Sequence, residues 1–143
     1  MNGTYKYSLD EKGRLMVPAK MREEIGGNLL IITRGLDKYL WLFPPAEWKE
    51  FSEKLLEATS IFQDKARLIL RRIIAPAQDV ELDKAGRIMI PPTLRDYAGL
   101  KKECMILGIK RFVEIWDEDQ YMEYDAKNEE VFQDAVKDLN IRW

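Results

Sequence analysis

The sequence contains no histidine and a single cysteine, Cys104, and these two absences exclude much of the usual catalytic chemistry. Without an imidazole base, Ser-His and Cys-His nucleophiles are excluded. Zinc sites built from Cys and His clusters are excluded for the same reason. One cysteine cannot form an intramolecular disulfide, which is typical of proteins in a reducing compartment, so we expect a cytoplasmic protein.

Several other signatures are missing. The sequence has neither a P-loop nor a G-x-G-x-x-G motif. No apolar run approaches the ~20 residues of a membrane span, and the opening "MNGTYKYSLD" lacks the pattern of a secretory signal. Carboxylate or lysine chemistry remains possible, but no cluster of such residues stands out. We therefore expect no enzyme, no cofactor, no metal and no membrane partner.

Negative charge is unevenly distributed, although the formal net charge of the whole chain is only −2. The segment from Glu114 to Trp143 contains ten acidic and three basic residues, so the rest of the chain is net positive. A basic surface is the electrostatic requirement for binding nucleic acid. The composition therefore favours a basic body with an acidic C-terminal tail.

One phrase occurs twice. "LDEKGRLMVPAKMR" begins at Leu9, and "LDKAGRIMIPPTLR" begins at Leu82. Residue n matches residue n+73 without a gap as far as Phe51, for example Gly35 with Gly108. This register predicts a duplicated module. Because a unit of about 45 residues buries too little surface to be stable alone, the two copies are expected to share one core.

Each copy has the same pattern of segments. Two β-rich runs flank an Asp-x-x-Gly turn, a short helix follows a proline and ends at a glycine, and two further apolar runs complete the unit. The pattern predicts an α+β fold built from two β-β-α-β-β modules with flanking helices. The expected divisions are module 1 at 5–47, a helical connector at 48–75, module 2 at 76–119 and an acidic C-terminal helix at 120–143.

The acidic C-terminal helix is predicted to be amphipathic. Val131, Ala135, Val136 and Leu139 fall on one face of it. This apolar stripe needs a place to dock, which is either the body of its own chain or a neighbouring subunit.

The repeated Asp-x-x-Gly is first of all a turn signal. Asp10 and Asp83 are expected to accept hydrogen bonds from nearby backbone N–H groups, while Gly13 and Gly86 adopt a positive φ. Asp10 is also placed to pair with Arg14 across the turn. These four turn residues are interpreted as structural.

The arginines that follow the turns are harder to explain as scaffold. Arg14 and Arg87 each begin a strand directly after a tight turn, where a planar guanidinium suits phosphate or guanine. The alternative is an ordinary solvated charged face, but two matched arginines favour binding. The predicted DNA-binding residues are Arg14, Arg87, Lys12, Lys84, Lys6 and Lys20.

The two phrases, with their flanks "LLIITRGLDKYLWLFPPAEWKEF" and "FVEIWDEDQY", resemble the swapped-hairpin signature of AbrB-like DNA-binding proteins. Two copies in one chain are typical of the MraZ family of transcriptional regulators. The resemblance implies that the hairpins interleave into a pseudo-symmetric β-barrel within one chain. It also implies a ring-shaped homo-oligomer and repeated double-stranded DNA boxes upstream of the protein's own division and cell-wall gene cluster. The arginines of the Asp-x-x-x-Arg motif, Arg14 and Arg87, are the DNA-contacting residues that the resemblance implies.

The sequence thus favours a sequence-specific DNA-binding transcription regulator that is cytoplasmic and nucleoid-associated. One alternative is an antitoxin-like module that binds a protein partner through its acidic tail. The other is a carboxylate-dependent enzyme, which would have a ligand-sized pocket beside both Asp10 and Asp83.

Overall fold

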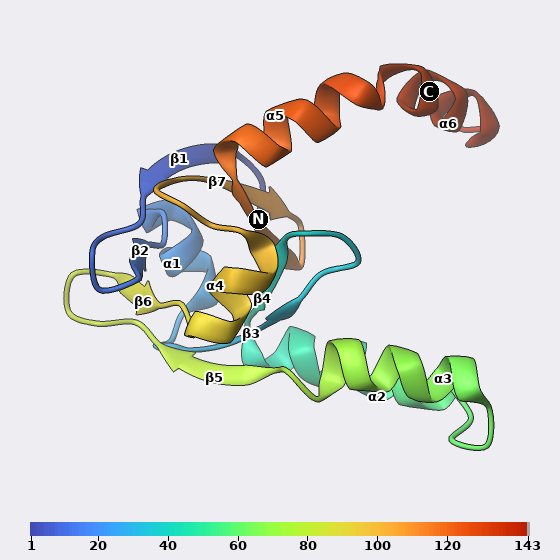
Figure 1. Ribbon diagram of the computed structural model, residues 1–143, viewed down its shortest axis with the longest axis horizontal. Coiled ribbons are helices and arrows are strands. Elements are labelled where there is room, and N and C mark those ends of the chain that lie inside the picture. Colours follow the sequence, from blue (N-terminus) through green and yellow to red (C-terminus); the bar gives the residue numbers. More distant parts are fainter. Residues whose placement is uncertain (143) are drawn as a thin grey trace.

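Each copy of the repeat folds as strand, strand, helix, strand, strand, in the order that the sequence pattern predicts. The computed structural model describes residues 1–142 (Figure 1). The elements of the first copy are β1 (Thr4–Ser8), β2 (Arg14–Met16), α1 (Ala19–Ile25), β3 (Leu29–Arg34) and β4 (Leu40–Phe43). Those of the second are β5 (Gln78–Glu81), β6 (Arg87–Met89), α4 (Pro92–Ala98), β7 (Glu103–Ile109) and β8 (Phe112–Asp117).

Proline and glycine set the limits of the two short helices. Pro18 and Pro91 precede α1 and α4 and end the preceding strands. Gly26 and Gly99 end the helices in the left-handed conformation, with φ of 74° and 62°. Residues with a Cβ adopt this conformation less readily, so each glycine fixes where its helix stops.

Strands of one copy pair with strands of the other. The six-stranded sheet has the order β1-β7-β8-β4-β3-β5, and β2 pairs with β6 in a separate two-stranded sheet. The first strand of each copy therefore lies beside the third strand of the other, and all recorded pairings are antiparallel. The two copies consequently form one mixed α+β body rather than two separate units.

The predicted closed β-barrel is not seen in the part of the chain that the structure describes. Strands β1 and β5 form opposite edges of the large sheet, which therefore stays open. The turns at Gly13 and Gly86 leave only three residues each for β2 and β6, and these strands pair only with each other. The hydrogen-bonding ladder is thus interrupted at both turns.

The main core is drawn from both copies. Leu15 and Ile88 lie opposite each other at the centre of the β2–β6 pair, and both are fully buried. Cys104 is buried in the same core, and burial raises the pKa of its thiol to about 12. A second, mainly aromatic cluster covers the opposite face of the six-stranded sheet. Its buried members are Tyr39, Trp41, Phe43, Ile73, Leu107 and Trp116.

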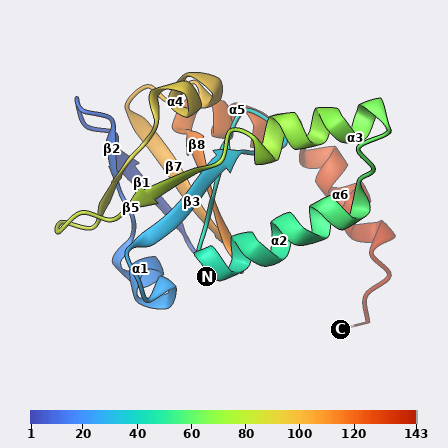
Figure 2. The same cartoon turned by 90° about the horizontal axis from the view of Figure 1, so that it is seen from below.

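Two helical arms extend from the same end of the body (Figure 1). The first arm connects the copies and consists of α2 (Pro45–Ala58), α3 (Asp64–Ile69) and the π-helical turn η1 (Leu70–Ile74). In Figure 2, α2 runs outward and α3 returns toward the sheet. Among residues 1–142, no helix combines the length and the apolar character that a membrane crossing requires.

The acidic C-terminal arm consists of two helices, α5 (Glu118–Lys127) and α6 (Glu129–Asp138), where the sequence pattern predicts one. They are separated at Asn128, whose side-chain amide donates to the carbonyl of Tyr124. Asparagine competes in this way with the regular helical hydrogen bonds. Trp143, the last residue of the predicted range 120–143, lies outside the described residues.

Candidate nucleic-acid interface

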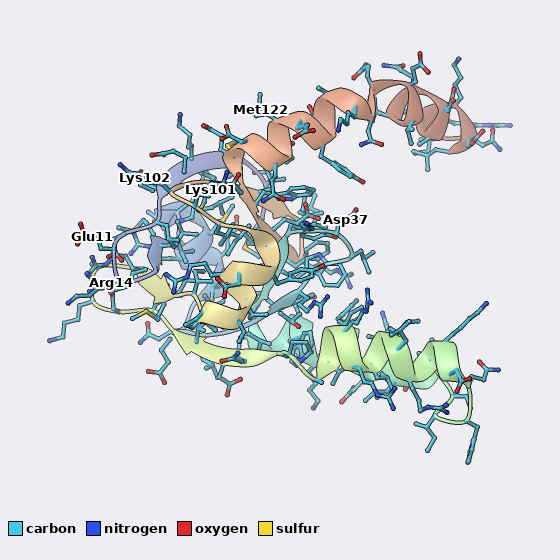
Figure 3. All side chains as sticks on the ribbon, in the orientation of Figure 1. Glu11, Arg14, Asp37, Lys101, Lys102 and Met122 are labelled. Atoms are coloured by element: carbon cyan, nitrogen blue, oxygen red, sulfur yellow. The ribbon has the colours of Figure 1, made fainter. Side chains whose placement is uncertain are left out.

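The two repeated turns lie next to each other because β2 and β6 pair. Leu15 faces Ile88 in this two-stranded sheet, and both side chains point into the core. Side chains alternate between the faces of a strand, so Arg14 and Arg87 lie on the opposite, outer face. Figure 3 shows Arg14 at the end of the body away from the two helical arms.

Each turn is bound to the other copy through its glycine carbonyl. The N–H of Val17 donates to the carbonyl of Gly86 at 2.9 Å, and the N–H of Ile90 donates to that of Gly13 at 2.8 Å. The two turns are therefore held in a fixed relation by backbone bonds that cross between the copies.

In the first turn, Asp10 organises both the backbone and the arginine. Its Oδ1 accepts from the N–H groups of Lys12 and Arg14, each at 2.9 Å. Its Oδ2 accepts from Nε of Arg14 at 2.7 Å. The backbone N–H of Arg14, with the guanidinium of the same residue, holds the pKa of Asp10 below its ordinary value.

The second turn repeats this arrangement. Oδ1 of Asp83 accepts from the N–H groups of Ala85 and Arg87 at 2.9 and 3.0 Å, and Oδ2 accepts from Nε of Arg87 at 3.1 Å. The backbone N–H of Arg87 is the main cause that lowers the pKa of Asp83. The prediction that Asp10 and Asp83 accept backbone hydrogen bonds within their turns is confirmed.

The two predicted arginines are close to each other. Nη1 of Arg87 lies 3.7 Å from Oδ2 of Asp10, the atom that also binds Arg14. The side chains of Arg14 and Arg87 are 30% and 32% exposed. Each guanidinium is thus fixed along its Nε edge by a carboxylate and still reaches the surface.

Two further arginines lie beside the turns, and the sequence interpretation did not include them among the binding residues. A Cβ added to Gly13 would stand 2.5 Å from Nη1 of Arg95, and one added to Gly86 would stand 2.5 Å from Cζ of Arg22. Gly13 and Gly86 have φ of 79° and 85°, so the predicted positive φ is confirmed. Each arginine belongs to the helix of the opposite copy. Arg22 and Arg95 are matched by the repeat, and that was the available signal.

The predicted lysines are not all brought to this place. Lys12 and Lys84 are exposed within the two turns, and Lys20 is exposed in the first turn of α1. Lys6 lies on β1, where its Nζ is 3.3 Å from Oε2 of Glu118 at the start of α5. The turns, with the helix arginines beside them, therefore form a surface that we name the turn surface. Its charged residues are Asp10, Glu11, Lys12, Arg14, Arg22, Asp83, Lys84, Arg87 and Arg95.

The turn surface is net positive, and its chemistry suits the binding of an anion. A guanidinium that is already oriented presents its remaining N–H donors in a planar fork that matches phosphate or the edge of guanine. A cavity of about 490 Å³ borders the second turn, with Asp83, Arg22 and Lys84 in its wall. Asp10 is not among the residues that line it, so this cavity does not join the two aspartates as the enzyme alternative would require.

Known proteins match both copies. A family model described as "MraZ protein, putative antitoxin-like" matches residues 1–72 and again residues 73–142. A Treponema denticola protein named "Transcriptional regulator MraZ" is 48% identical to this chain over 139 residues, covering 97% of this chain and 96% of that protein. A Treponema pallidum protein of the same name is 47% identical over 137 residues, covering 96% of this chain and 92% of that protein.

Proposed function

The chain belongs to the MraZ family, and on that premise we propose that it is a transcription regulator that binds double-stranded DNA sequence-specifically through the turn surface. The observation that carries the proposal is the pair of adjacent arginines, Arg14 and Arg87, each oriented by an aspartate of its own turn. The relatives named "Transcriptional regulator MraZ" support regulation of transcription.

The arginines act as pre-oriented donors. Because the carboxylates fix the Nε edges, less side-chain freedom is lost when the Nη groups bind a phosphate or a base. Lys12 and Lys84 add sequence-independent attraction from the same turns. The lowered pKa values of Asp10 and Asp83 keep both carboxylates charged at neutral pH, so the orientation persists there.

The working unit is a ring of several copies. In this proposal the modules at 5–47 and 76–119 each contribute one turn, arranged as in AbrB-like swapped hairpins, and the strand exchange between copies supports that likeness. A ring presents several turn surfaces to repeated boxes upstream of the protein's own division and cell-wall gene cluster, in the nucleoid. Linking weak contacts raises the overall avidity by effective concentration.

Fluorescence anisotropy tests the proposal with the DNA upstream of the gene and a scrambled probe at two salt concentrations. Arg14→Ala/Arg87→Ala is expected to cost about 1–3 kcal/mol for each engaged arginine and to abolish the preference for the upstream DNA. Wild-type affinity is expected to fall with salt, with a slope of about −0.9 per phosphate contact.

Lys54→Ala/Lys127→Ala is the matched control. These exposed lysines are also 73 positions apart, just beyond the matched range, and each pairs with a glutamate on its own helix. The control removes the same charge far from the turns and is expected to bind like wild type. Equal losses in both double variants would show that net charge alone matters. Unchanged binding by the arginine variant would refute the turn surface as the DNA site.

A second candidate is an antitoxin-like module that binds a protein, and the exposed acidic helix α6 is the observation that favours it. In that case neither DNA probe would bind, and a protein partner would be retained through the C-terminal arm.

A further inference from the structure

Helix α6 has an apolar stripe that the described residues do not cover. Every residue from Glu129 to Asp138 is exposed, including Val131 and Val136, and the side chain of Phe132 is 58% exposed. At 100° per residue, the stripe continues to the exposed Leu139.

The stripe is bordered by acidic residues. Glu129 and Asp138 lie along its two margins, and Glu130 and Asp134 lie further round the helix, which contains one lysine, Lys137. Isolated helices of ten residues are marginal in water, and amphipathic helices gain most of their stability from packing. We therefore expect the helix to pack against an apolar surface that carries positive charge.

Such a surface exists on the other arm of the chain. A cavity of about 170 Å³ lies between the β3–β4 turn, α4 and the α3–η1 segment. Its apolar rim is exposed: Leu36 is 71% exposed, Leu68 is 50% exposed and Ile69 is also exposed. We name it the arm cavity.

The arm cavity is positively charged. Arg34 and Arg72 line it, and none of its lining residues is acidic. Within residues 1–142, neither arginine takes part in a recorded ion pair, and the buried Nε of Arg34 has no hydrogen-bond partner. The guanidinium of Arg34 lies 3.9 Å above the ring of Tyr97, whose hydroxyl donates to the carbonyl of Asp37 at 2.6 Å. Arg34 is therefore held against Tyr97, and Arg72 is exposed. Neither cation has a carboxylate that neutralises it.

We propose that α6 of one copy docks into the arm cavity of a second copy. The apolar stripe covers Leu36, Leu68 and Ile69, and the acidic margins face Arg34 and Arg72. In Figure 1, α6 lies on one arm and α3 on the other, well apart, so the contact joins two chains rather than two parts of one. Opposite charges on the two surfaces select this pairing.

The contact is heterologous, since two different surfaces meet, and a pair of copies joined by one contact keeps one free α6 and one free arm cavity. Such contacts propagate from copy to copy and generate a ring when the rotation closes. The inference thus deepens the ring assembly proposed above and rests on it, but it does not depend on which DNA is bound.

Disulfide trapping tests the contact directly. Leu68→Cys is introduced in one full-length chain and Phe132→Cys in a second chain with a size tag, and the two are mixed under mild oxidation. The native Cys104 is buried and does not compete. A mixed dimer is expected to form about tenfold faster than with Gln133→Cys, which lies on the polar face of α6, because docking raises the effective concentration of the thiols. Equal rates would overturn the proposal.

A chain that contains both Leu68→Cys and Phe132→Cys distinguishes the remaining geometry. Cross-linked dimers and larger species are expected. A disulfide formed only within one chain would overturn the proposal, because it would place α6 in the arm cavity of its own subunit.

Light scattering of Val136→Asp separates the failure of the contact from that of the ring. Val136 is exposed, so the chain is expected to fold, and the assembly is expected to shift toward monomers, whereas Gln133→Asp assembles like wild type. If Val136→Asp assembles normally, the α6 contact is wrong and the ring stands. If wild type itself is a monomer at all concentrations, both fail, and anisotropy with a single DNA box still tests the turn surface.

Discussion

The two copies of the repeat have kept the same interior and acquired different surroundings. Leu15 and Ile88 are matched by the repeat and pack against each other in the core. The helices that follow the copies differ: α2 is followed by the returning α3–η1 segment, whereas α5 continues into the projecting α6. Duplication therefore preserved the residues on which both copies depend and left the outer helices free to diverge.

One buried position shows how the neighbouring elements determine which type of residue is present. Thr33 in β3 pairs with Trp41, and Leu107 in β7 pairs with Glu114, the residue that matches Trp41 in the repeat. Thr33 and Leu107 therefore occupy equivalent positions, and both are buried. The hydroxyl of Thr33 donates to the carbonyl of Ile73 in η1 at 2.6 Å. The second copy has no helix equivalent to η1 among the described residues, and there a leucine fills the place. A polar residue is thus present where a helix offers an acceptor and absent where none is offered.

The largest effect is expected where the copies are most alike. Leu15→Ala and Ile88→Ala should each lower the free energy of unfolding by about 2–5 kcal/mol, because each empties the same part of the core. Urea denaturation measures both. Leu56→Ala, at an exposed position of α2, should change stability by less than about 0.5 kcal/mol. If only one core variant is destabilised, the core is not shared equally.

A smaller effect should separate the copies. Thr33→Val is expected to cost about 1–3 kcal/mol, because it leaves the carbonyl of Ile73 without its hydrogen bond. Leu107→Ile keeps the side-chain volume and removes no hydrogen bond, so it should cost less than about 1.5 kcal/mol. Thermal and urea unfolding of both variants measure the difference. A Thr33→Val protein as stable as wild type would mean that water replaces the hydroxyl.

The smallest expected effect is on the stability of the fold at low pH. The folded chain holds the pKa values of Asp10 and Asp83 below the ordinary value of 3.8, so the unfolded chain binds more protons as the pH falls. The stabilisation is present above about pH 4 and is lost as the pH falls through the lowered values. Asp10→Asn and Asp83→Asn should each flatten the acid limb of a stability-against-pH curve.

The two aspartates are expected to differ slightly in this test. Asp10 faces Arg14 at 2.7 Å and also Arg87 at 3.7 Å, whereas the bond from Arg87 to Asp83 is 3.1 Å long. Asp10→Asn should therefore flatten the curve more than Asp83→Asn. Equal flattening would show that the difference in arginine contacts does not matter and that the backbone donors, which the two turns share, set the pKa shifts.

The sequence predicted the local features of this fold well. The element order within each copy, the turn roles of Asp10 and Gly13, and the proline and glycine limits of the short helices all depend on neighbours in the chain. The arrangement of strands does not, which is why the expected closed barrel differs from the open sheet. The β2 and β6 strands are too short to continue the ladder from β1 and β5.

The turn surface was predictable only in part for the same reason. Arg14 and Arg87 belong to the turns that they serve, so a repeated motif is enough to find them. Arg22 and Arg95 reach the turns only because each helix packs against the turn of the opposite copy. Their proximity is a consequence of strand exchange, which no local pattern encodes.

Strand exchange also determines when β1 can pair during synthesis of the chain. The partner of β1 in the sheet is β7, and Thr4 of β1 pairs with Leu107 of β7. At about 5–20 residues per second, roughly 5–20 seconds separate the synthesis of these two strands. The N-terminal copy therefore leaves the ribosome with an unpaired strand and waits for its partner. Such non-local pairing folds slowly, so β1 has no partner strand until residue 107 has emerged.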